Sequence, residues 1–594
     1  MRVACSASLR AMFSVALLAL AAALSSWTAT AAAAEPGRLW RVTLEAPEEL
    51  RPLLEENLDL FRLGGRTGLD DEFVEHLAAR SAGEVRDLLA TAGHFRPETF
   101  IDARRENGVL VVHLRVEPGP QAVVTTTDIR VGGAIETAGG DALRAKRLVE
   151  RWRLRPGTAF RQSAWDTAKD ALLRSLLLDG YPAARITDSR AEVDADTAQV
   201  SLRVHVDSGP LFLYGETQIE GLQRYPRSLL DNLRRYHPGQ RYNHEDLLRY
   251  QSALQGSGFF RSVSVAVDPD PAQAAAATVR VIVIENPAMK IDLGDGISTD
   301  SGPRGELTFT RYNSFQPGWQ STTRLRADRK EQTFSSELAL LPEPGDWRNR
   351  LGVEASRSDI EDLVTRRFGL IAQRSWRSPE REHDWSVKFQ TEEQSLNAGP
   401  VDNLNALTLN YSWTRRRVND LLRPRQGHMI NLQLGGATAA LLSTRSFTRA
   451  YGRGLYIVPL TRRDRIHLRG EAGAVWSDAR EGIPTEFLFR AGGDQSVRGY
   501  DYQSLGVRQG SAVVGGRFLG VATIEYQRDL TRDWGAAVFA DAGNAADTPS
   551  SLKPVQGYGV GVRWMTPAGA LNLDLARGRE TGQLRLHFTL GTRF

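Results

Sequence analysis

The chain has 594 residues, a formal net charge of +4 and a single cysteine, and 25% of its residues are charged. This length allows several domains, and the near balance of 75 basic against 71 acidic residues gives no electrostatic reason to expect a nucleic-acid partner. Mean hydropathy is −0.34, and no run of about 18 apolar residues follows the first segment, so the sequence offers no membrane-spanning helix there.

The first segment has the features of a secretory signal. Arg2 and Arg10 precede an apolar stretch from Ala11 to Leu24, which is too short to cross a bilayer. Small residues then continue to Ala34. We expect cleavage just before Glu35, which defines residues 1–34 as a signal peptide. Cys5 would leave with this segment, so no disulfide and no cysteine metal site is expected in the mature chain.

An internal repeat of about 80 residues follows the signal. Three times a helical pattern ends at a glycine with an aromatic residue next to it or one position further on, at Gly93, Gly180 and Gly258, where glycine would supply a left-handed helix cap. Each repeat closes with an alternating strand and a turn. The pattern predicts three small α+β modules, which span residues 35–119, 120–209 and 210–286.

From Pro287 to Phe594 the sequence alternates apolar and polar residues, for example over Leu404–Thr414, Tyr558–Trp564 and Leu584–Leu590. A soluble sandwich would also alternate. A membrane barrel is favoured by the number of such segments, by aromatic residues near their ends and by Arg and His on the polar face. Because a strand of about 9–11 residues spans a bilayer, residues 287–594 have room for roughly 16 antiparallel strands.

A glycine-flanked arginine lies in the segment Val497-Arg498-Gly499-Tyr500, which follows Ala491-Gly492-Gly493-Asp494-Gln495-Ser496. With the signal and the repeated modules, this segment resembles the Omp85 superfamily, whose members carry N-terminal POTRA domains before a C-terminal outer-membrane barrel. The three modules and the segment Gly294–Arg304 at the start of the barrel resemble the branch named after TamA, the outer-membrane subunit of the translocation and assembly module. The resemblance covers essentially the whole chain after residue 34.

For the arginine, the resemblance implies a position inside the barrel, close to carboxylates on the inner faces of strands near the C-terminus. The matching carboxylates are Glu525 and Asp541. A planar guanidinium can bind both through several hydrogen bonds and so fix the direction of the loop. The alternative is that Arg498 is an ordinary solvated loop residue. Strict alternation places Phe539 on the same inner face as Asp541, so either an aromatic lines the lumen or a bulge lies nearby.

The two ends of the barrel sheet form the second candidate site. Gly294 and Gly296 in the first strand, around Lys290–Thr299, lack side chains and lower its stability. The resemblance implies that this strand and the last one, with Phe588 and Phe594, form a lateral seam where a client strand adds to the exposed edge. A second interpretation is that these glycines only permit curvature in a tight barrel.

The resemblance further implies an outer-membrane protein whose periplasmic modules receive clients and whose seam assists insertion of barrel proteins such as autotransporters. A TamB-like partner anchored in the inner membrane would dock on the first module. Two alternatives stay open: a two-partner-type secretion pore, and phospholipid passage to the outer membrane with the TamB-like partner. Such pores usually carry two modules and a plug helix, for which Glu35–Arg38 leave no room.

Motifs for enzymatic chemistry were not found in the sequence. It contains no Gly-x-Ser-x-Gly, no Walker loop, no His-Glu-x-x-His and no cysteine pair for zinc. Acidic pairs such as Glu392-Glu393 are interpreted as solvated charges and not as a general acid and base. We therefore expect no catalytic residue, no metal, no other cofactor and no enzyme activity.

Overall fold

The computed structural model describes residues 40–64, 71–106, 109–137, 141–298, 301–315, 317–397, 399–421, 423–566 and 569–590. The expected signal peptide and Cys5 lie outside these ranges. The chain divides into two compact units, and the dividing line runs through the third repeat. None of the helices in the described ranges is long and apolar enough to cross a membrane.

The first repeat folds as a three-stranded sheet with helices. Its central strand pairs in parallel with the first strand and antiparallel with the second, in the order β1-β3-β2. The long helix packs Val74, Leu77, Val85 and Leu89 into the core at helical spacing. The elements are β1 (Trp40–Glu45), α2 (Arg51–Asn57), α3 (Asp59–Arg62), α4 (Asp71–Thr91), β2 (Glu98–Glu106) and β3 (Val109–Glu117).

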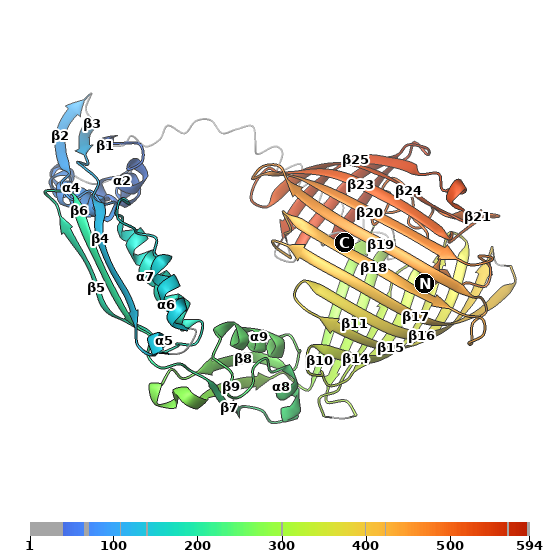
Figure 1. Ribbon diagram of the computed structural model, residues 1–594. Coiled ribbons are helices and arrows are strands. Elements are labelled where there is room, and N and C mark those ends of the chain that lie inside the picture. Colours follow the sequence, from blue (N-terminus) through green and yellow to red (C-terminus); the bar gives the residue numbers. More distant parts are fainter. Residues whose placement is uncertain are drawn as a thin grey trace, which may run out of the picture. The chain divides into compact units, whose positions relative to one another are not determined.

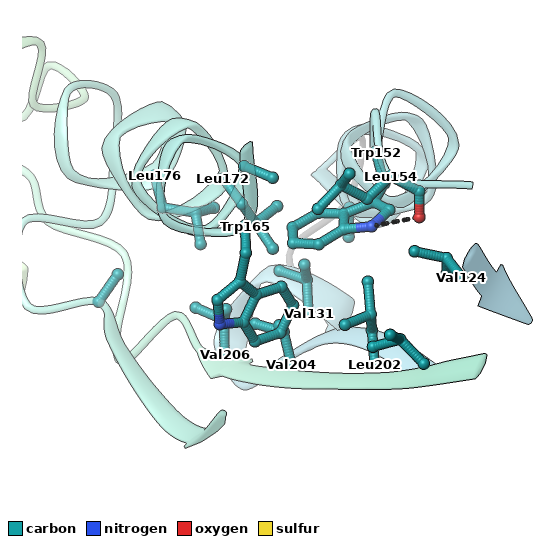
Figure 2. Close-up of a cluster of buried hydrophobic side chains, with 14 of the residues drawn as sticks. Val124, Val131, Trp152, Leu154, Trp165, Leu172, Leu176, Leu202, Val204 and Val206 are labelled. Carbon is teal, nitrogen blue, oxygen red and sulfur yellow. Dashed lines mark hydrogen bonds between the residues drawn. The ribbon is translucent and has the colours of Figure 1, made fainter. Parts of the chain in front are cut away.

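The second repeat has the same strand order, β4-β6-β5, with β4 parallel to β6. Its elements are β4 (Val123–Gly132), α5 (Ala134–Thr137), α6 (Asp141–Glu150), α7 (Gln162–Leu177), β5 (Arg185–Asp194) and β6 (Gln199–Asp207). One face of α7 meets the alternating apolar face of β6 (Figure 2). In this core the rings of Trp152 and Trp165 meet edge to face at 6.1 Å, and Trp152 Nε1 donates to Leu154 O.

The third repeat again orders its strands with the last one in the middle, as β7-β9-β8. Its elements are β7 (Tyr214–Glu220), α8 (Arg227–Leu233), α9 (His244–Gln255), β8 (Phe260–Val267), the 3-10 helix η1 (Pro271–Ala276) and β9 (Ala277–Glu285). The predicted helix caps at Gly93, Gly180 and Gly258 all have positive φ, between 82° and 92°. The three α+β modules of the predicted fold class are therefore confirmed, while their exact boundaries stay a prediction.

The rest of the chain forms a 16-stranded antiparallel sheet that curls into a barrel (Figure 1). Neighbouring strands in the sheet follow one another along the chain, as in an up-and-down barrel. The strands are β10 (Met289–Ser298), β11 (Gly302–Tyr312), β12 (Gln320–Ala327), β13 (Glu331–Ala339), β14 (Trp347–Ile360), β15 (Leu363–Arg377), β16 (Arg381–Leu396), β17 (Val401–Val418), β18 (Gly427–Ala437), β19 (Phe447–Pro459), β20 (Asp464–Trp476), β23 (Phe518–Asp529), β24 (Trp534–Ala546), β25 (Val555–Thr566), β26 (Gly569–Gly578) and β27 (Leu584–Leu590). The predicted barrel of 16 strands is confirmed.

Because the strand number is even, β10 begins and β27 ends at the same end of the barrel, which we call the module side. There α8 contacts the β13–β14 turn, where Asn232 Nδ2 donates to Pro342 O at 2.9 Å. The opposite end, the far side, carries the connection between β20 and β23, residues 477–517. This arginine loop contains the 3-10 helix η2 (Thr485–Phe487) and a hairpin of β21 (Val507–Gln509) and β22 (Ala512–Val514); the 3-10 helix η3 (Pro549–Ser551) follows β24.

The outer face of the barrel wall carries an aromatic cluster near the module side. Trp385 lies 5.5 Å from Trp347 and 5.2 Å from Tyr411, measured between ring centroids, on β14, β16 and β17. Further along these strands the outer residues are aliphatic, as with Leu351 and Leu409, which are exposed in the isolated chain. An apolar band bordered by aromatic rings is the pattern of a wall that faces lipid.

Candidate functional site

A strip of glycines on the inner face of β25 makes room inside the barrel. Gly557, Gly559 and Gly561 alternate with outward-facing Tyr558, Val560 and Val562. A Cβ at Gly557 would lie 2.0 Å from the backbone oxygen of Arg498, and one at Gly561 would lie 1.9 Å from a carboxylate oxygen of Asp574. This strip therefore lets the arginine loop lie directly against the backbone of the wall.

Arg498 is fully buried on the lumen side of the barrel wall, and its carboxylate partners lie on β23, β24 and β26. Its Nε and Nη2 donate to the two carboxylate oxygens of Asp541 at 2.7 and 2.9 Å, and Nη1 donates to Glu525 at 2.8 Å. The backbone N–H of Arg498 also donates to Asp541, at 3.1 Å. The structure thus brings the motif arginine to both carboxylates that the resemblance pointed to, in the bidentate geometry that only arginine offers.

Phe539 lies on the same inner face of β24 as Asp541, as strict alternation predicts. The registers of β24 with β23 and with β25 run without a shift, so no bulge is present. The ring is buried in the lumen, and the Arg498 guanidinium carbon lies 3.2 Å from its centroid. Of the two expected alternatives, the aromatic in the lumen is the one observed, and it covers one face of the guanidinium.

A third carboxylate and a second arginine complete the cluster, and the sequence interpretation missed both. Asp574 on β26 accepts from Arg498 Nη1 at 3.1 Å, and Arg563 on β25 binds Asp574 at 2.5 Å and Glu525 at 2.6 Å. Each of these side chains is at most 9% exposed. The sequence of β26 did contain a signal for Asp574. This residue alternates with the outward-facing Leu573 and Leu575, so its side chain faces the lumen.

The first half of the arginine loop is fixed to the opposite wall, on β15 and β16. Glu486 in η2 accepts from Lys388 Nζ at 2.7 Å and lies 3.3 Å from Arg367. Glu392 accepts from the backbone N–H and the hydroxyl of Thr485, both at 2.9 Å. Glu392 is buried, so its interpretation as a solvated charge is wrong: its position on β16 faces the lumen, where the loop covers it.

The β21–β22 hairpin of the loop contacts the far-side turns. Val513 N donates to Glu361 O at 3.0 Å, and Ser511 Oγ donates to Asp362 at 2.7 Å. Asn397, in the β16–β17 turn, donates to Gln509 O at 3.3 Å. Together with the contacts on β15, β16 and β23–β26, these bonds hold the loop across the lumen from one wall to the other.

The first and last strands form the ends of the sheet, and within the described ranges no backbone register joins β27 to β10. Gly294 and Gly296 on β10 have space around them, since a Cβ would meet its nearest neighbours at 3.7 and 3.4 Å. Packing does not require these glycines, in contrast to the strip on β25. Phe588 lies on β27 and pairs with outward-facing Leu573, whereas Phe594 lies outside the described residues.

Groups of His, Cys, Asp and Glu that could hold a metal ion do not occur among the described residues. The carboxylates of Glu525, Asp541 and Asp574 are all engaged by arginine.

Three α+β modules followed by a barrel with a loop held inside define a class of modular β-barrel proteins. Residues 304–594 match the family model of the Omp85 superfamily domain, and the chain therefore contains an Omp85 superfamily domain. This match supports the resemblance over residues 304–594, while the TamA branch stays a prediction.

Solved structures with the same fold include BamA from Haemophilus ducreyi lacking POTRA domains 1–3. It aligns with a TM-score of 0.64 and 14% identity over 80% of this chain and 100% of that chain. CdiB from Acinetobacter baumannii aligns with a TM-score of 0.44 and 12% identity over 88% of this chain and 98% of its own. The first of these likenesses supports the fold alone, and the second is too low to argue from.

Proposed function

We propose that this protein is an outer-membrane assembly factor with its modules in the periplasm. In this proposal the modules receive unfolded barrel clients, such as autotransporters, and the seam between β10 and β27 assists their insertion. The outer-membrane lipid bilayer surrounds the barrel. A TamB-like protein anchored in the inner membrane docks on the first module, as in the TamA branch.

The observation that carries the proposal is the contrast between the lumen and the sheet ends. The arginine loop is bonded to opposite walls of the lumen through Glu486 and Arg498, so a route through the lumen requires its displacement. At the sheet ends, by contrast, no register joins the described parts of β10 and β27, and a strand at the end of a sheet offers the edge needed for strand addition. These contacts favour assembly at the seam over passage through the lumen.

Crosslinking of clients to β10 tests the proposal. Cysteine introduced at Leu293, which is 81% exposed, should form crosslinks to a nascent autotransporter barrel in cells, because its strand would pair with the incoming client. The same cysteine at Leu351, an outward-facing residue of β14 far along the sheet from the seam, serves as the matched control and should trap no client.

Other outcomes would favour the alternatives. No client trapped at any position of β10, combined with a phospholipid imbalance in a deletion strain whose clients insert normally, would support phospholipid passage. Loss of a secreted partner protein without any effect on barrel insertion would support the two-partner-type pore.

A further inference from the structure

Beyond the buried cluster, the next four residues of the loop turn toward the seam. Gly499 N donates to His587 Nε2 on β27 at 3.0 Å. Asp501 forms a two-point ion pair with Arg585 on β27, in which Arg585 Nη2 donates at 2.7 Å. Tyr500 OH contacts Glu580 in the β26–β27 turn and donates to Gln556 O at 3.1 Å. The loop therefore holds the last strand of the sheet from inside.

Tyr502 extends the same segment to the other side of the seam. The Lys330 ammonium, in the turn between β12 and β13, lies 5.5 Å from the centroid of the Tyr502 ring, within the range of a cation–π interaction. Adjacent loop residues thus contact β27 on one side of the seam and the hairpin that follows β10 and β11 on the other.

A cavity of about 450 Å³ lies at the same place. It is lined by Gly296 of β10, Arg304 of β11, Tyr502 of the loop, and Phe588 of β27, among others. Elements from both ends of the sheet therefore meet around one space, and the loop contributes part of its wall.

The two sets of loop contacts differ in strength. Arg498 is 0% exposed, whereas the side chains of Asp501 and Arg585 are 50% and 31% exposed. Water and salt screen the outer ion pair, so its free energy is small compared with that of the buried cluster. The loop is consequently held firmly on β23–β26 and by the buried Gly499–His587 hydrogen bond, whereas its contacts through Asp501 and Tyr502 on the two sides of the seam are weak.

We infer that Asp501 and Tyr502 are positioning residues that clasp the seam from inside, so that the two ends of the sheet separate without moving Arg498. This inference rests on the proposed function, because it names the groups that regulate opening at the same seam. The two weak contacts break first when a client strand competes for the edge, and they re-form once the client has left.

Hydrogen exchange of the full chain in lipid nanodiscs tests the clasp. Arg585→Ala removes a contact on β27, and we expect amide exchange in β10, across the seam, to rise about two- to fivefold, the range that one exposed ion pair supports. Lys330→Gln removes the contact on the other side, and exchange in β27 should rise by a similar factor. Exchange in β23–β26 should stay unchanged in both variants.

Two further variants separate the clasp from a local structural effect. The exchanged pair Asp501→Arg with Arg585→Asp should restore exchange toward that of the unmodified chain, because the ion pair is rebuilt with reversed polarity. Arg366→Ala breaks an exposed ion pair with Glu393 away from the seam and should leave both end strands unchanged. Unchanged exchange across the seam in Arg585→Ala and Lys330→Gln would overturn the clasp. Failure of the proposed function has another signature, namely loss of client crosslinks at Leu293 in the otherwise unmodified chain.

Discussion

Arg498 shows how a buried cation becomes a structural centre. Taking a guanidinium out of water costs several kcal/mol, and only close carboxylates with good geometry recover that energy. The side chain of Asp541 accepts two hydrogen bonds from the guanidinium, Glu525 and Asp574 accept one each, and the ring of Phe539 covers one face of the guanidinium. Arg563 then shares the negative charge of Glu525 and Asp574. The cluster is stable as a whole, and each member depends on the others.

Replacing Arg498 should therefore be costly. Arg498→Ala leaves three carboxylates near one another with only Arg563 to balance them, and we expect the free energy of unfolding to fall by about 3–5 kcal/mol. Denaturant unfolding of the full chain in detergent, followed by tryptophan fluorescence, measures this change. Arg508→Ala, an exposed arginine of the same loop, is the control and should change stability by no more than about 0.5 kcal/mol. Equal effects of the two substitutions would contradict the cluster's role.

Gly557 gives a second prediction for single residues. In Gly557→Ala the added methyl would lie 2.0 Å from Arg498 O, so loop or strand must shift, at a cost of about 1–3 kcal/mol. Gly470→Ala on β20 is the matched control, since a Cβ there has nothing within 4 Å. Thermal unfolding in detergent compares the two. A Gly557→Ala variant as stable as Gly470→Ala would mean that the loop does not lie against β25.

Part of the Arg498 site was predictable from the sequence, and the remaining contacts were not, for physical reasons. The motif around Arg498 pointed to Glu525 and Asp541 because the resemblance covers those positions. Asp574 was missed and Glu392 was wrongly interpreted as a solvated charge because their partners lie far away along the chain, and alternation reveals only that a residue faces the lumen. What covers a lumen-facing charge depends on the path of the loop, which no local pattern encodes.

At the scale of elements, a group of ion pairs joins the second module to the segment just before α9. Arg241 binds both carboxylate oxygens of Asp141, the first residue of α6, at 2.8 and 2.7 Å, and Asp179 at 3.0 Å. Tyr181 OH donates to Asp141 at 2.8 Å. Burial opposes ionisation of Asp141, but the hydrogen bonds from Arg241 and Tyr181 outweigh it and lower the pKa of this carboxyl below its ordinary value.

This pKa predicts a dependence of stability on pH. Because the pKa of Asp141 is lower in the folded than in the unfolded chain, its contribution is present above the ordinary value of 3.8 and is lost as the pH falls through the folded value. Asp141→Asn should destabilise the second module by about 1.5–3 kcal/mol at pH 7. It should have little effect at a pH below the folded pKa of Asp141. Hydrogen exchange of α6 at the two pH values measures the difference. The same loss at both would show that the charge is not involved.

Modules and barrel were predictable to different depths at this scale. Positive φ at Gly93, Gly180 and Gly258 followed from glycine at the end of each helical pattern. The alternating segments predicted β17, β25 and β27, because a strand with one apolar face has apolar residues at every second position. The short hairpin β21–β22 was not predicted, since its residues form no alternating run and are fixed by contacts with distant turns.

For the whole molecule, the loop inside the barrel predicts low ion flow. The full chain in a planar bilayer should show little steady conductance, because bonds to opposite walls keep the loop in the lumen. Glu486→Ala frees the first half of the loop from Lys388 and Arg367, and transient openings should become several times more frequent. Glu481→Ala, at an exposed position of the same loop, is the control. A large and steady conductance of the unmodified chain would favour the secretion pore.

The bare inner face of β25 also limits how such barrels can be recombined. A chimera that receives this loop on a wall with ordinary side chains at the positions of Gly557 and Gly561 would have no space for the main chain at Arg498 or for the carboxylate of Asp574. A chimera that keeps the glycines but receives a foreign loop would instead contain an empty channel along one strand. Loop and strand must therefore be transplanted, and inherited, as one unit.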